Sequence, residues 1–460
     1  MTGIFPRITI AGMAGDSGKT LVTTSILAEL HRLHKKTAAF KKGPDFIDAA
    51  WLSLASRTTA RNLDTFIMGS EYVFSSFISN AVNDGFNIIE GNRGLFDGTE
   101  TGENSTAELA KLLKSPVVLI CSPVKVTRTA AAMIMGCKLF DKDVKIAGII
   151  LNRISGKRHE SVVKRAIEET CDIPVIGAIP KFEQNAVLPD RHLGLVTPEE
   201  MEKSSEKIDA LADICRDHID IDKLIEISSD VPALGSASFE EISENIPNEV
   251  RIGYFCDSAF TFYYPENLEA LIKKGAELVK ISAISDTSLP DIDALYIGGG
   301  FPETHMIEIE KNSALRNSVK NAAESGMPIY AECGGLIYLS RSISWKGSRH
   351  SMADVFPVHM EMHDKPRGHG YCIIEADNDN PFFPEGTVLK GHEFHYSSID
   401  HGHDALETAF SVKRGTGCFN KRDGLIYKNV LAGYTHLHDG GASVWSDAMV
   451  DAARKFKSRI

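Results

Sequence analysis

Residues that could bind phosphate lie near the start of the chain. The segment Gly12-Met-Ala-Gly-Asp-Ser-Gly-Lys-Thr20 follows a short apolar run and precedes a helix-forming run. In a phosphate-binding loop, backbone N–H groups and a helix N-terminus bind the phosphates, the lysine reaches the β- and γ-phosphates, and the hydroxyl binds Mg²⁺. The strict spacing needs glycine at position 13, which is Met13 here, so a Gly-rich turn that binds nothing is the alternative. The predicted nucleotide-binding residues are Gly15, Ser17, Gly18, Lys19 and Thr20.

Acidic residues follow two later runs that are typical of strands. They lie in Lys41-Lys-Gly-Pro-Asp-Phe-Ile-Asp48 and in Glu90-Gly-Asn-Arg-Gly-Leu-Phe-Asp97. Ligands of open α/β sheets bind beyond the carboxyl ends of the strands, so we expect Glu90 beside the nucleotide. A carboxylate in that place can hold Mg²⁺ directly or through water. The candidate metal ligands are Thr20, Asp45 and Glu90, and the candidates for a second cation or a substrate are Asp45, Asp48 and Asp97.

Two further polar segments have structural explanations that compete with functional ones. Asn152 follows the run Ile146–Leu151, at a point where phosphate-loop proteins often place a side chain that contacts the base. Capping or turn formation explains a single asparagine equally well. In Asn104–Glu108, a serine and a threonine precede a helical run, and this pattern favours a helix N-cap over a ligand site.

A cysteine in the second half has the surroundings of a nucleophile. Met327-Pro-Ile-Tyr-Ala-Glu-Cys333-Gly-Gly-Leu336 reads as a strand, a cysteine and small residues that lead into a helix. A tight turn there would expose the sulfur, and the helix N-terminus would favour the thiolate. Upstream, the strand-like run Leu295–Ile297 ends in three glycines. We predict that Gly299 and Gly300 supply an oxyanion hole. The alternative for a lone cysteine such as Cys333 is that it is a small buried hydrophobic residue, the more common state of a free cysteine.

Histidines late in the chain could serve as the base that such a cysteine needs. His436 and His438 alternate in Ala432-Gly-Tyr-Thr-His-Leu-His438, which places both on one face of a strand. A second cluster in 391–397 contains His392, Glu393 and His395. Neighbouring residues of a strand point to opposite faces, so we favour an interface or substrate role for this cluster over a metal site.

The elements that must position these residues form two α/β halves. From about residue 7 to 225, short β-branched runs alternate with helical segments, which is typical of a doubly wound parallel sheet. We expect strands at Ile8–Ala11, Phe86–Glu90, Val117–Cys121, Ile146–Leu151 and Val175–Ile179, and a helix at Lys19–Leu33. Residues 226–249 are rich in Ser, Glu and Pro and read as a linker. A strand at Val250–Phe255 then begins a second unit, 250–460.

Composition excludes several classes of protein. The chain has 460 residues with 43% hydrophobic and 24% charged residues, which is typical of two or three globular domains. Its formal net charge of −12 argues against binding to nucleic acid or to an anionic membrane. We find no apolar run long enough to span a membrane and no secretory signal. The eight cysteines contain no CxxC pair, and free thiols favour the cytoplasm.

Together these motifs resemble a known family, the glutamine-dependent a,c-diamide synthases of tetrapyrrole biosynthesis. The resemblance covers nearly the whole chain. It includes the variant phosphate loop, Gly-Pro-Asp-Phe-Ile-Asp, Asn62-Leu-Asp-Thr and Glu-Gly-x-x-Gly-Leu-Phe-Asp-Gly in the first half. In the second half it includes Ala259–Asn267, Gly-Gly-Gly-Phe-Pro-Glu, Ala-Glu-Cys-Gly-Gly-Leu, Gly-His-Glu-Phe-His-Tyr-Ser and Tyr-Thr-His-Leu-His.

The resemblance implies a role for each half. Residues 1–225 would form a P-loop NTPase-like domain similar to dethiobiotin synthetase, which binds ATP–Mg²⁺ and the tetrapyrrole and forms an acyl phosphate. Residues 250–460 would form a class I-like glutamine amidotransferase, with Cys333 as nucleophile and His436 as base, whose ammonia passes inside the protein to the acyl phosphate. Many such glutaminases have His-x-Glu, but position 438 is histidine here, so the third member of a triad stays open. Lys41 would bind the γ-phosphate or a substrate carboxylate, and Asn152 the nucleotide.

The substrate and some rival functions remain open at this point. The resemblance implies L-glutamine and a tetrapyrrole polycarboxylate as partners, either cobyrinate or a sirohydrochlorin-type ring such as siroheme or Ni-sirohydrochlorin, and a homodimer. The ligase half of a lipid-linked cell-wall amidating enzyme would resemble peptidoglycan ligases, which the Gly-Pro-Asp-Phe-Ile-Asp segment does not. A partitioning or scaffold ATPase would carry an early second lysine in its loop, where this chain has Met13 and Ala14. A binding module with a dead glutaminase is disfavoured by the intact Cys333 and His436.

Overall fold

The structure is a computed structural model that describes residues 3–182, 188–191, 194–201, 204–235, 248–400 and 406–459. It separates into two compact units. Unit 1 comprises residues 1–65 and 69–240, and unit 2 comprises residues 66–68 and 241–460. The three residues Phe66–Met68, inside the predicted domain 1–225, are grouped with unit 2. No helix in the described ranges has the length and apolar character needed to cross a membrane.

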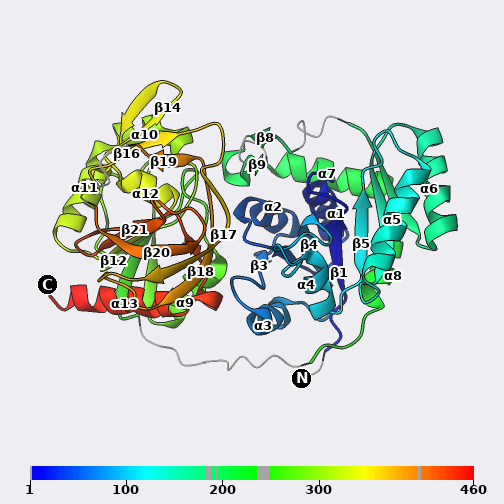
Figure 1. The fold of residues 1–460 in the computed structure, drawn as a ribbon, viewed down its shortest axis with the longest axis horizontal. Coiled ribbons are helices and arrows are strands. Elements are labelled where there is room, and N and C mark those ends of the chain that lie inside the picture. The colour runs from blue at the N-terminus through cyan, green and yellow to red at the C-terminus, as the bar shows by residue number, and fades with distance from the viewer. Residues whose placement is uncertain are drawn as a thin grey trace. The chain divides into compact units, whose positions relative to one another are not determined.

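Unit 1 is built on a seven-stranded parallel sheet with the order β3-β2-β4-β1-β5-β6-β7 (Figure 1). The strands are β1 (Arg7–Gly12), β2 (Thr37–Lys42), β3 (Arg61–Leu63), β4 (Phe86–Gly94), β5 (Val117–Cys121), β6 (Ile146–Ile154) and β7 (Val175–Pro180), and a separate hairpin consists of β8 (Asp190–Arg191) and β9 (Gly194–Leu195). The predicted doubly wound parallel sheet is confirmed. Its strands are buried on both faces, as their β-branched sequences require.

Helices cover both faces of this sheet (Figure 1). They are α1 (Lys19–Arg32), α2 (Phe46–Ser56), α3 (Ser70–Asn80), α4 (Thr106–Leu112), α5 (Arg128–Phe140), α6 (Lys157–Cys171), α7 (Ser204–His218) and α8 (Ile221–Ser229), with a 3₁₀ turn at Pro198–Glu200. One core contains side chains of α1, α2, α7 and α8, and the other contains side chains of α4, α5 and α6. The predicted N-cap in 104–108 is confirmed, because the Ser105 side chain accepts a hydrogen bond from the Glu108 N–H.

The predicted linker begins later than residue 226. Helix α8 continues to Ser229, because Ile227 packs into the core of unit 1 and the helix is capped by Asp220 at its start. Residues 231–235 are described without a helix, residues 236–247 lie outside the described ranges, and the next strand begins at Val250. The rise in Ser and Glu content therefore starts inside a helix.

Unit 2 contains a ten-stranded mixed sheet with the order β11-β10-β12-β13-β22-β21-β20-β17-β18-β23. Its strands are β10 (Val250–Phe255), β11 (Ala276–Ile281), β12 (Ala294–Ile297), β13 (Ile329–Glu332), β17 (Gly368–Ala376), β18 (Val388–His395), β20 (Thr408–Arg414), β21 (Arg422–Tyr427), β22 (Val430–Gly433) and β23 (His436–Leu437). The first five strands of the order pair in parallel and the remaining pairs are antiparallel. The predicted strand at Val250–Phe255 is confirmed.

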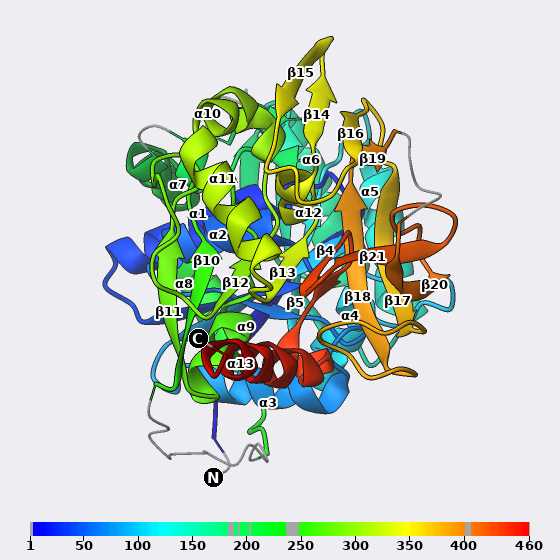
Figure 2. The same cartoon turned by 90° about the vertical axis from the view of Figure 1, so that its left-hand side faces the viewer.

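Helices cover both faces of the parallel part of this sheet (Figure 2). They are α9 (Pro265–Lys273), α10 (Met306–Lys311), α11 (Ser313–Glu324), α12 (Gly334–Leu339) and α13 (Val444–Lys457), with 3₁₀ turns at Pro302–His305 and Asp439–Gly441. Side chains of α10, α11 and α12 share one core, and those of α9 and α13 share the other. A smaller sheet consists of β14 (Ser342–Trp345), β15 (Ser348–Ser351), β16 (His359–Met362) and β19 (Ser397–Ile399).

Candidate active sites

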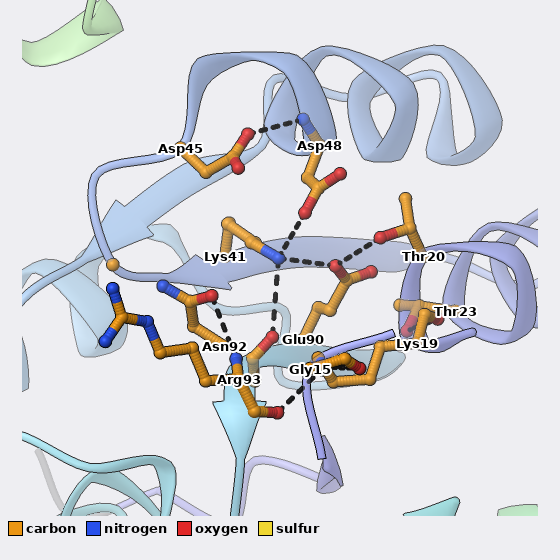
Figure 3. A network of polar contacts seen from close by, with 12 residues as sticks. Gly15, Lys19, Thr20, Thr23, Lys41, Asp45, Asp48, Glu90, Asn92 and Arg93 are labelled. Carbon is orange, nitrogen blue, oxygen red and sulfur yellow. Dashed lines mark hydrogen bonds and ion pairs between the residues drawn. The ribbon is translucent and has the colours of Figure 1, made fainter. Parts of the chain in front are cut away.

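The predicted phosphate loop joins β1 to α1 in unit 1. Gly18 precedes the helix with φ of 87°, a left-handed conformation that favours glycine. The Nζ atom of Lys19 donates to the carbonyl of Arg93 at 2.8 Å and to those of Ala14 and Gly15 at 3.3 and 3.4 Å (Figure 3). Burial lowers the pKa of Lys19, and the charge of Lys41 lowers it further. The Lys19 ammonium thus donates only to neutral backbone carbonyls of the loop. The charged oxygens of a bound phosphate would be stronger acceptors and would replace these carbonyls.

Asn152 is hydrogen-bonded to the same loop. Its side-chain nitrogen donates to the Ser17 carbonyl at 2.9 Å, and its side-chain oxygen accepts from the backbone N–H of Arg153 at 2.9 Å. The hydroxyl of Ser122 donates to the same Ser17 carbonyl at 3.2 Å. Both ends of the Asn152 amide therefore bind the protein itself, and contact with a nucleotide base stays a prediction.

A buried ion cluster lies at the carboxyl ends of β2 and β4. The Nζ atom of Lys41 lies 2.5 Å from Oδ2 of Asp48 and 2.6 Å from Oε1 of Glu90, and Thr20 donates to the same Glu90 oxygen at 3.0 Å (Figure 3). The second oxygen of Glu90, Oε2, is buried and has no hydrogen-bond partner among the described residues. The structure therefore brings Lys41, Asp48 and Glu90 together at one edge of the sheet, and their roles toward metal, phosphate and substrate stay predictions.

The charges of this cluster shift one another. Burial lowers the pKa of Lys41, but Asp48, Glu90 and Asp45 outweigh it and hold that pKa well above the usual range. Burial raises the pKa of Glu90, and burial followed by the charge of Asp48 raises the pKa of Asp45 to about 7. Burial also raises the pKa of Asp48, but Lys41 outweighs it, so the net shift is downward. The positive charge of Lys41 offsets the cost of burying these carboxylates.

The other two predicted aspartates have structural partners. Asp45 caps α2, because its Oδ1 accepts from the Asp48 N–H at 2.8 Å, and Asn62 donates to the Asp45 carbonyl at 3.0 Å. Asp97 is exposed and closes a turn, since its Oδ2 accepts from the Gly94 N–H at 2.8 Å. In the described part of the chain, no three His, Cys, Asp or Glu side chains are grouped so that they could hold a metal ion by themselves.

Cys333 of unit 2 stands on a sharp turn between β13 and α12. Its φ of 48° and ψ of −95° are strained for a residue with a side chain, and its N–H donates to the Gly433 carbonyl at 2.7 Å. The predicted strand–cysteine–helix turn is confirmed. Such strain is a feature of turns that present a nucleophile.

His436 lies beside Cys333 and is enclosed by the fold. Its ring stacks on that of His392, with centroids 4.8 Å apart, and its Nδ1 lies 3.3 Å from Oε2 of Glu332. Burial lowers the pKa of His436, but the hydrogen bonds and negative charges of Cys333 and Glu332 outweigh it and raise this pKa to about 10. Burial, with the charge of His436, lowers the pKa of His392 well below its usual range. His436 is therefore placed where it could exchange a proton with Cys333, and its role as the base stays a prediction.

The carboxylate next to His436 is one that the sequence analysis did not consider. From the sequence, the third group was open between His438 and another residue. His438 instead lies against α9, where its Nδ1 accepts from the Gly440 N–H at 3.0 Å and its Nε2 is 3.5 Å from Oε2 of Glu266. The sequence did offer one sign of this carboxylate: the acidic residue Glu332 directly precedes the predicted nucleophile Cys333.

The predicted oxyanion-hole glycines are close to this pair. A Cβ built on Gly299 would lie 2.6 Å from Cε1 of His436, and one built on Gly334 would lie 2.9 Å from the amide nitrogen of Gly300. The Gly300 amide therefore sits beside the residue that follows the nucleophile. Whether these amides bind an oxyanion stays a prediction.

The cluster in 391–397 divides between two places. His392 belongs to the Cys333 site, whereas Glu393 accepts from the Gly417 N–H at 2.9 Å and lies 3.6 Å from His395. The ring of His395 stacks on that of Tyr434 at 3.5 Å. Backbone and aromatic groups of unit 2 bind both side chains, which offers a structural explanation for Glu393 and His395, and the expected interface or substrate role stays a prediction.

Comparison with known proteins assigns the two units to two families. Residues 8–196 match the CobQ/CobB/MinD/ParA nucleotide binding domain, and residues 251–443 match the CobB/CobQ-like glutamine amidotransferase domain. A cobyrinate a,c-diamide synthase of Magnetococcus marinus is 39% identical over 447 residues, which cover 96% of each chain. This chain belongs to the cobyrinate a,c-diamide synthase family.

Other members of the family are similarly close. Cobyrinate a,c-diamide synthases of Archaeoglobus fulgidus and Methanobrevibacter smithii are 39% and 38% identical to this chain and cover 94% of it. These matches cover both units, so the family assignment applies to the glutamine amidotransferase half as well as to the nucleotide-binding half. A partitioning or scaffold ATPase, the rival from another class, is not favoured by these relatives, and neither is a sirohydrochlorin-type ring.

Proposed function

We propose that this chain uses ATP and glutamine to amidate the a- and c-acetate carboxylates of cobyrinate. The observation that carries this proposal is the full-length match to cobyrinate a,c-diamide synthases, in a chain with a phosphate loop in one unit and a cysteine–histidine pair in the other. A carboxylate does not react with ammonia at neutral pH unless it is activated. ATP supplies the leaving group, and glutamine supplies the nitrogen.

In unit 1, the described residues fit a nucleotide with Mg²⁺. Thr20 and the unpartnered Oε2 atom of Glu90 offer hard oxygen ligands at the loop, which suits a cation that takes its remaining ligands from phosphates and water. When bound, Mg²⁺ would neutralise charge on the phosphates that are transferred. Lys19 would release its carbonyl acceptors and bind the β- and γ-phosphates, while Asn152 and Ser122 hold the loop through the Ser17 carbonyl.

The side chains beside the loop would then position the substrate carboxylate. Lys41 is fixed by Asp48 and Glu90 and offers a cation for a γ-phosphate or an acetate group. The acetate oxygen attacks the γ-phosphorus, and the bond from the γ-phosphorus to the bridging β-phosphate oxygen breaks. ADP departs, and the acetate group has become an acyl phosphate. We keep Asp45, Asp48 and Asp97 as substrate candidates, with the structural contacts of Asp45 and Asp97 as their competing explanation.

In unit 2, Cys333 would attack the carboxamide carbon of glutamine. His436 accepts the thiol proton and then donates it to the departing nitrogen, so that ammonia leaves and a glutamyl thioester remains. The amides at Gly299 and Gly300 would stabilise the oxyanion. Water then hydrolyses the thioester to glutamate and restores the thiol, and the ammonia attacks the acyl phosphate to give the amide and phosphate.

Two further properties belong to this proposal. All eight cysteines are free in the structure, which supports a location in the reducing cytoplasm. The family resemblance implies a homodimer, which size-exclusion chromatography with light scattering would test.

The proposal is tested by the dependence of ATP hydrolysis on the added ring. With Mg²⁺ and glutamine present, we expect ADP to form rapidly when cobyrinate is added and slowly without it. Siroheme and Ni-sirohydrochlorin are added in parallel. Rapid ADP formation with one of these rings and not with cobyrinate would refute the proposed substrate while preserving the reaction.

A further inference from the structure

The acidic residue that contacts the catalytic histidine comes from the position directly before the nucleophile. We propose that Glu332 is a positioning residue of the glutaminase reaction, which fixes the ring of His436 and compensates its charge while Cys333 acts as nucleophile. This inference rests on the glutaminase step of the proposed function. It does not depend on which tetrapyrrole is amidated.

Three contacts hold the Glu332 carboxylate in place. Its Oε2 lies 3.3 Å from Nδ1 of His436, and its Oε1 accepts from the Leu437 N–H at 3.1 Å. The hydroxyl of Tyr296 donates to Oε2 at 3.2 Å. Glu332 is only 2% exposed, so the carboxylate is shielded from water and anchored by β12 on one side and β23 on the other.

The turn at Cys333 explains how two consecutive residues reach one histidine. In a regular strand, neighbouring side chains point to opposite faces. Glu332 is the last residue of β13, and the positive φ of Cys333 breaks the strand pattern at the next position. Both side chains consequently face His436, one at the imidazole and one as the nucleophile.

The other titratable groups near His436 do not compete for this role. His392 stacks on the ring and is kept neutral, because burial and the charge of His436 lower its pKa. His438 is bound by Gly440 and Glu266, and its ring lies 4.7 Å from that of Tyr264. Glu332 is therefore the acidic side chain in contact with His436 among the described residues.

This arrangement has a consequence for the proton. With Nδ1 bound to Glu332, Nε2 is the nitrogen that remains to exchange a proton with the thiol and the departing amine. A carboxylate at Nδ1 favours the protonated ring, and a protonated ring favours the thiolate beside it. Loss of the Glu332 carboxylate should therefore make the Cys333 thiolate less favourable and leave the reaction of unit 1 unchanged.

The test compares Glu332→Gln with a matched control, Glu393→Gln, in the full chain. Both glutamates are buried, accept a backbone N–H and face a histidine, but Glu393 faces His395 and not the Cys333 pair. Removing a charge-assisted hydrogen bond of this kind predicts a fall of about 10- to 100-fold in glutamine-dependent kcat. Amidation with high ammonia should stay within a few-fold of the unchanged protein, and Glu393→Gln should retain glutamine use.

A second readout follows the thiolate itself. Iodoacetamide is added across a pH series, and peptide mass spectrometry separates Cys333 from the other seven cysteines. We expect Glu332→Gln to move the onset of Cys333 alkylation to higher pH, whereas Glu393→Gln leaves it in place. An unchanged alkylation profile together with an unchanged kcat would overturn the proposal.

A third variant covers the case in which Glu332→Gln does not fold. Tyr296→Phe keeps the carboxylate and removes one of its hydrogen bonds, so it predicts a smaller fall, about threefold, in glutamine-dependent kcat with ammonia use retained. No change in Tyr296→Phe alongside an unfolded Glu332→Gln would assign Glu332 to folding alone and refute the positioning role. Failure of cobyrinate amidation with both nitrogen sources would instead count against the proposed function.

Discussion

The Nζ atom of Lys41 lies 2.6 Å from Oε1 of Glu90, and both side chains are almost completely buried. The lysine is shared with Asp48, so one cation faces two carboxylates at the edge of the sheet where the phosphate loop begins. Breaking such a pair from one side leaves an uncompensated charge in the protein interior. The ion cluster is therefore a proposed binding site whose buried charges also affect the stability of the protein.

Lys41→Met should destabilise the protein. Removing the cation leaves Glu90 and Asp48 without their partner, and we expect the free energy of unfolding to fall by about 3–5 kcal/mol. Chemical denaturation of both proteins measures this difference. The double variant Lys41→Met/Glu90→Gln should recover part of the loss, because one of the two buried charges is then gone. A loss of under about 1 kcal/mol in the single variant would contradict the account.

Glu90→Gln should weaken the use of Mg²⁺. The variant keeps the shape of the side chain and loses the negative oxygen that has no partner within the described structure. We expect about tenfold more Mg²⁺ to be needed for half-maximal ATP hydrolysis, measured at saturating ATP and cobyrinate. Glu108→Gln, at an exposed glutamate paired with Lys111, is the control and should leave the Mg²⁺ titration unchanged. An unchanged titration in Glu90→Gln would remove Glu90 from the metal site.

Lys19→Ala should abolish amidation with either nitrogen source. The phosphate loop loses the cation that would bind the β- and γ-phosphates, so no acyl phosphate forms. The measurement is amide formation with glutamine and, separately, with ammonium chloride. Lys36→Ala, at an exposed lysine paired with Asp84, is the control. Activity of Lys19→Ala with ammonia would show that the phosphate site has been placed wrongly.

Cys333→Ala should lose glutamine use and keep ammonia use. The thiol is the predicted nucleophile, whereas ammonia enters the reaction after that step. Cys418→Ala removes another buried thiol of unit 2, one that donates to Asp423, and should keep both activities. If Cys333→Ala lost both activities while remaining folded, the division of labour between the units would be wrong.

Much of this protein could be predicted from local sequence. The strands at Val117–Cys121 and Val250–Phe255 agree residue by residue with the structure, since short runs rich in apolar residues between polar segments leave little choice of boundary. The phosphate loop and the turn at Cys333 were equally visible, because glycine and the reactive residue are adjacent in sequence. Each of these features depends on a short segment.

What could not be predicted depends on long-range contacts. Glu332 and His436 are 104 positions apart, and the alternation of a regular strand would have turned Glu332 away from the site. Asn152 gave no sign that it would bind the Ser17 carbonyl 135 positions earlier. The predicted start of the linker at residue 226 was wrong because Ser228 and Ser229 are typical of a linker, whereas the packing of Ile227 within α8 is visible only in three dimensions.

The most direct measurement is mass spectrometry of cobyrinate after reaction with ATP, Mg²⁺ and glutamine labelled with ¹⁵N in its amide. Each exchange of a hydroxyl for an ordinary amide lowers the mass by about one dalton, and the heavy nitrogen nearly cancels that loss. The account predicts a diamide that is about two daltons lighter than cobyrinate with ordinary glutamine and almost equal to it in mass with the labelled donor. An unmodified ring, in a reaction where glutamate and ammonia are released, would contradict it.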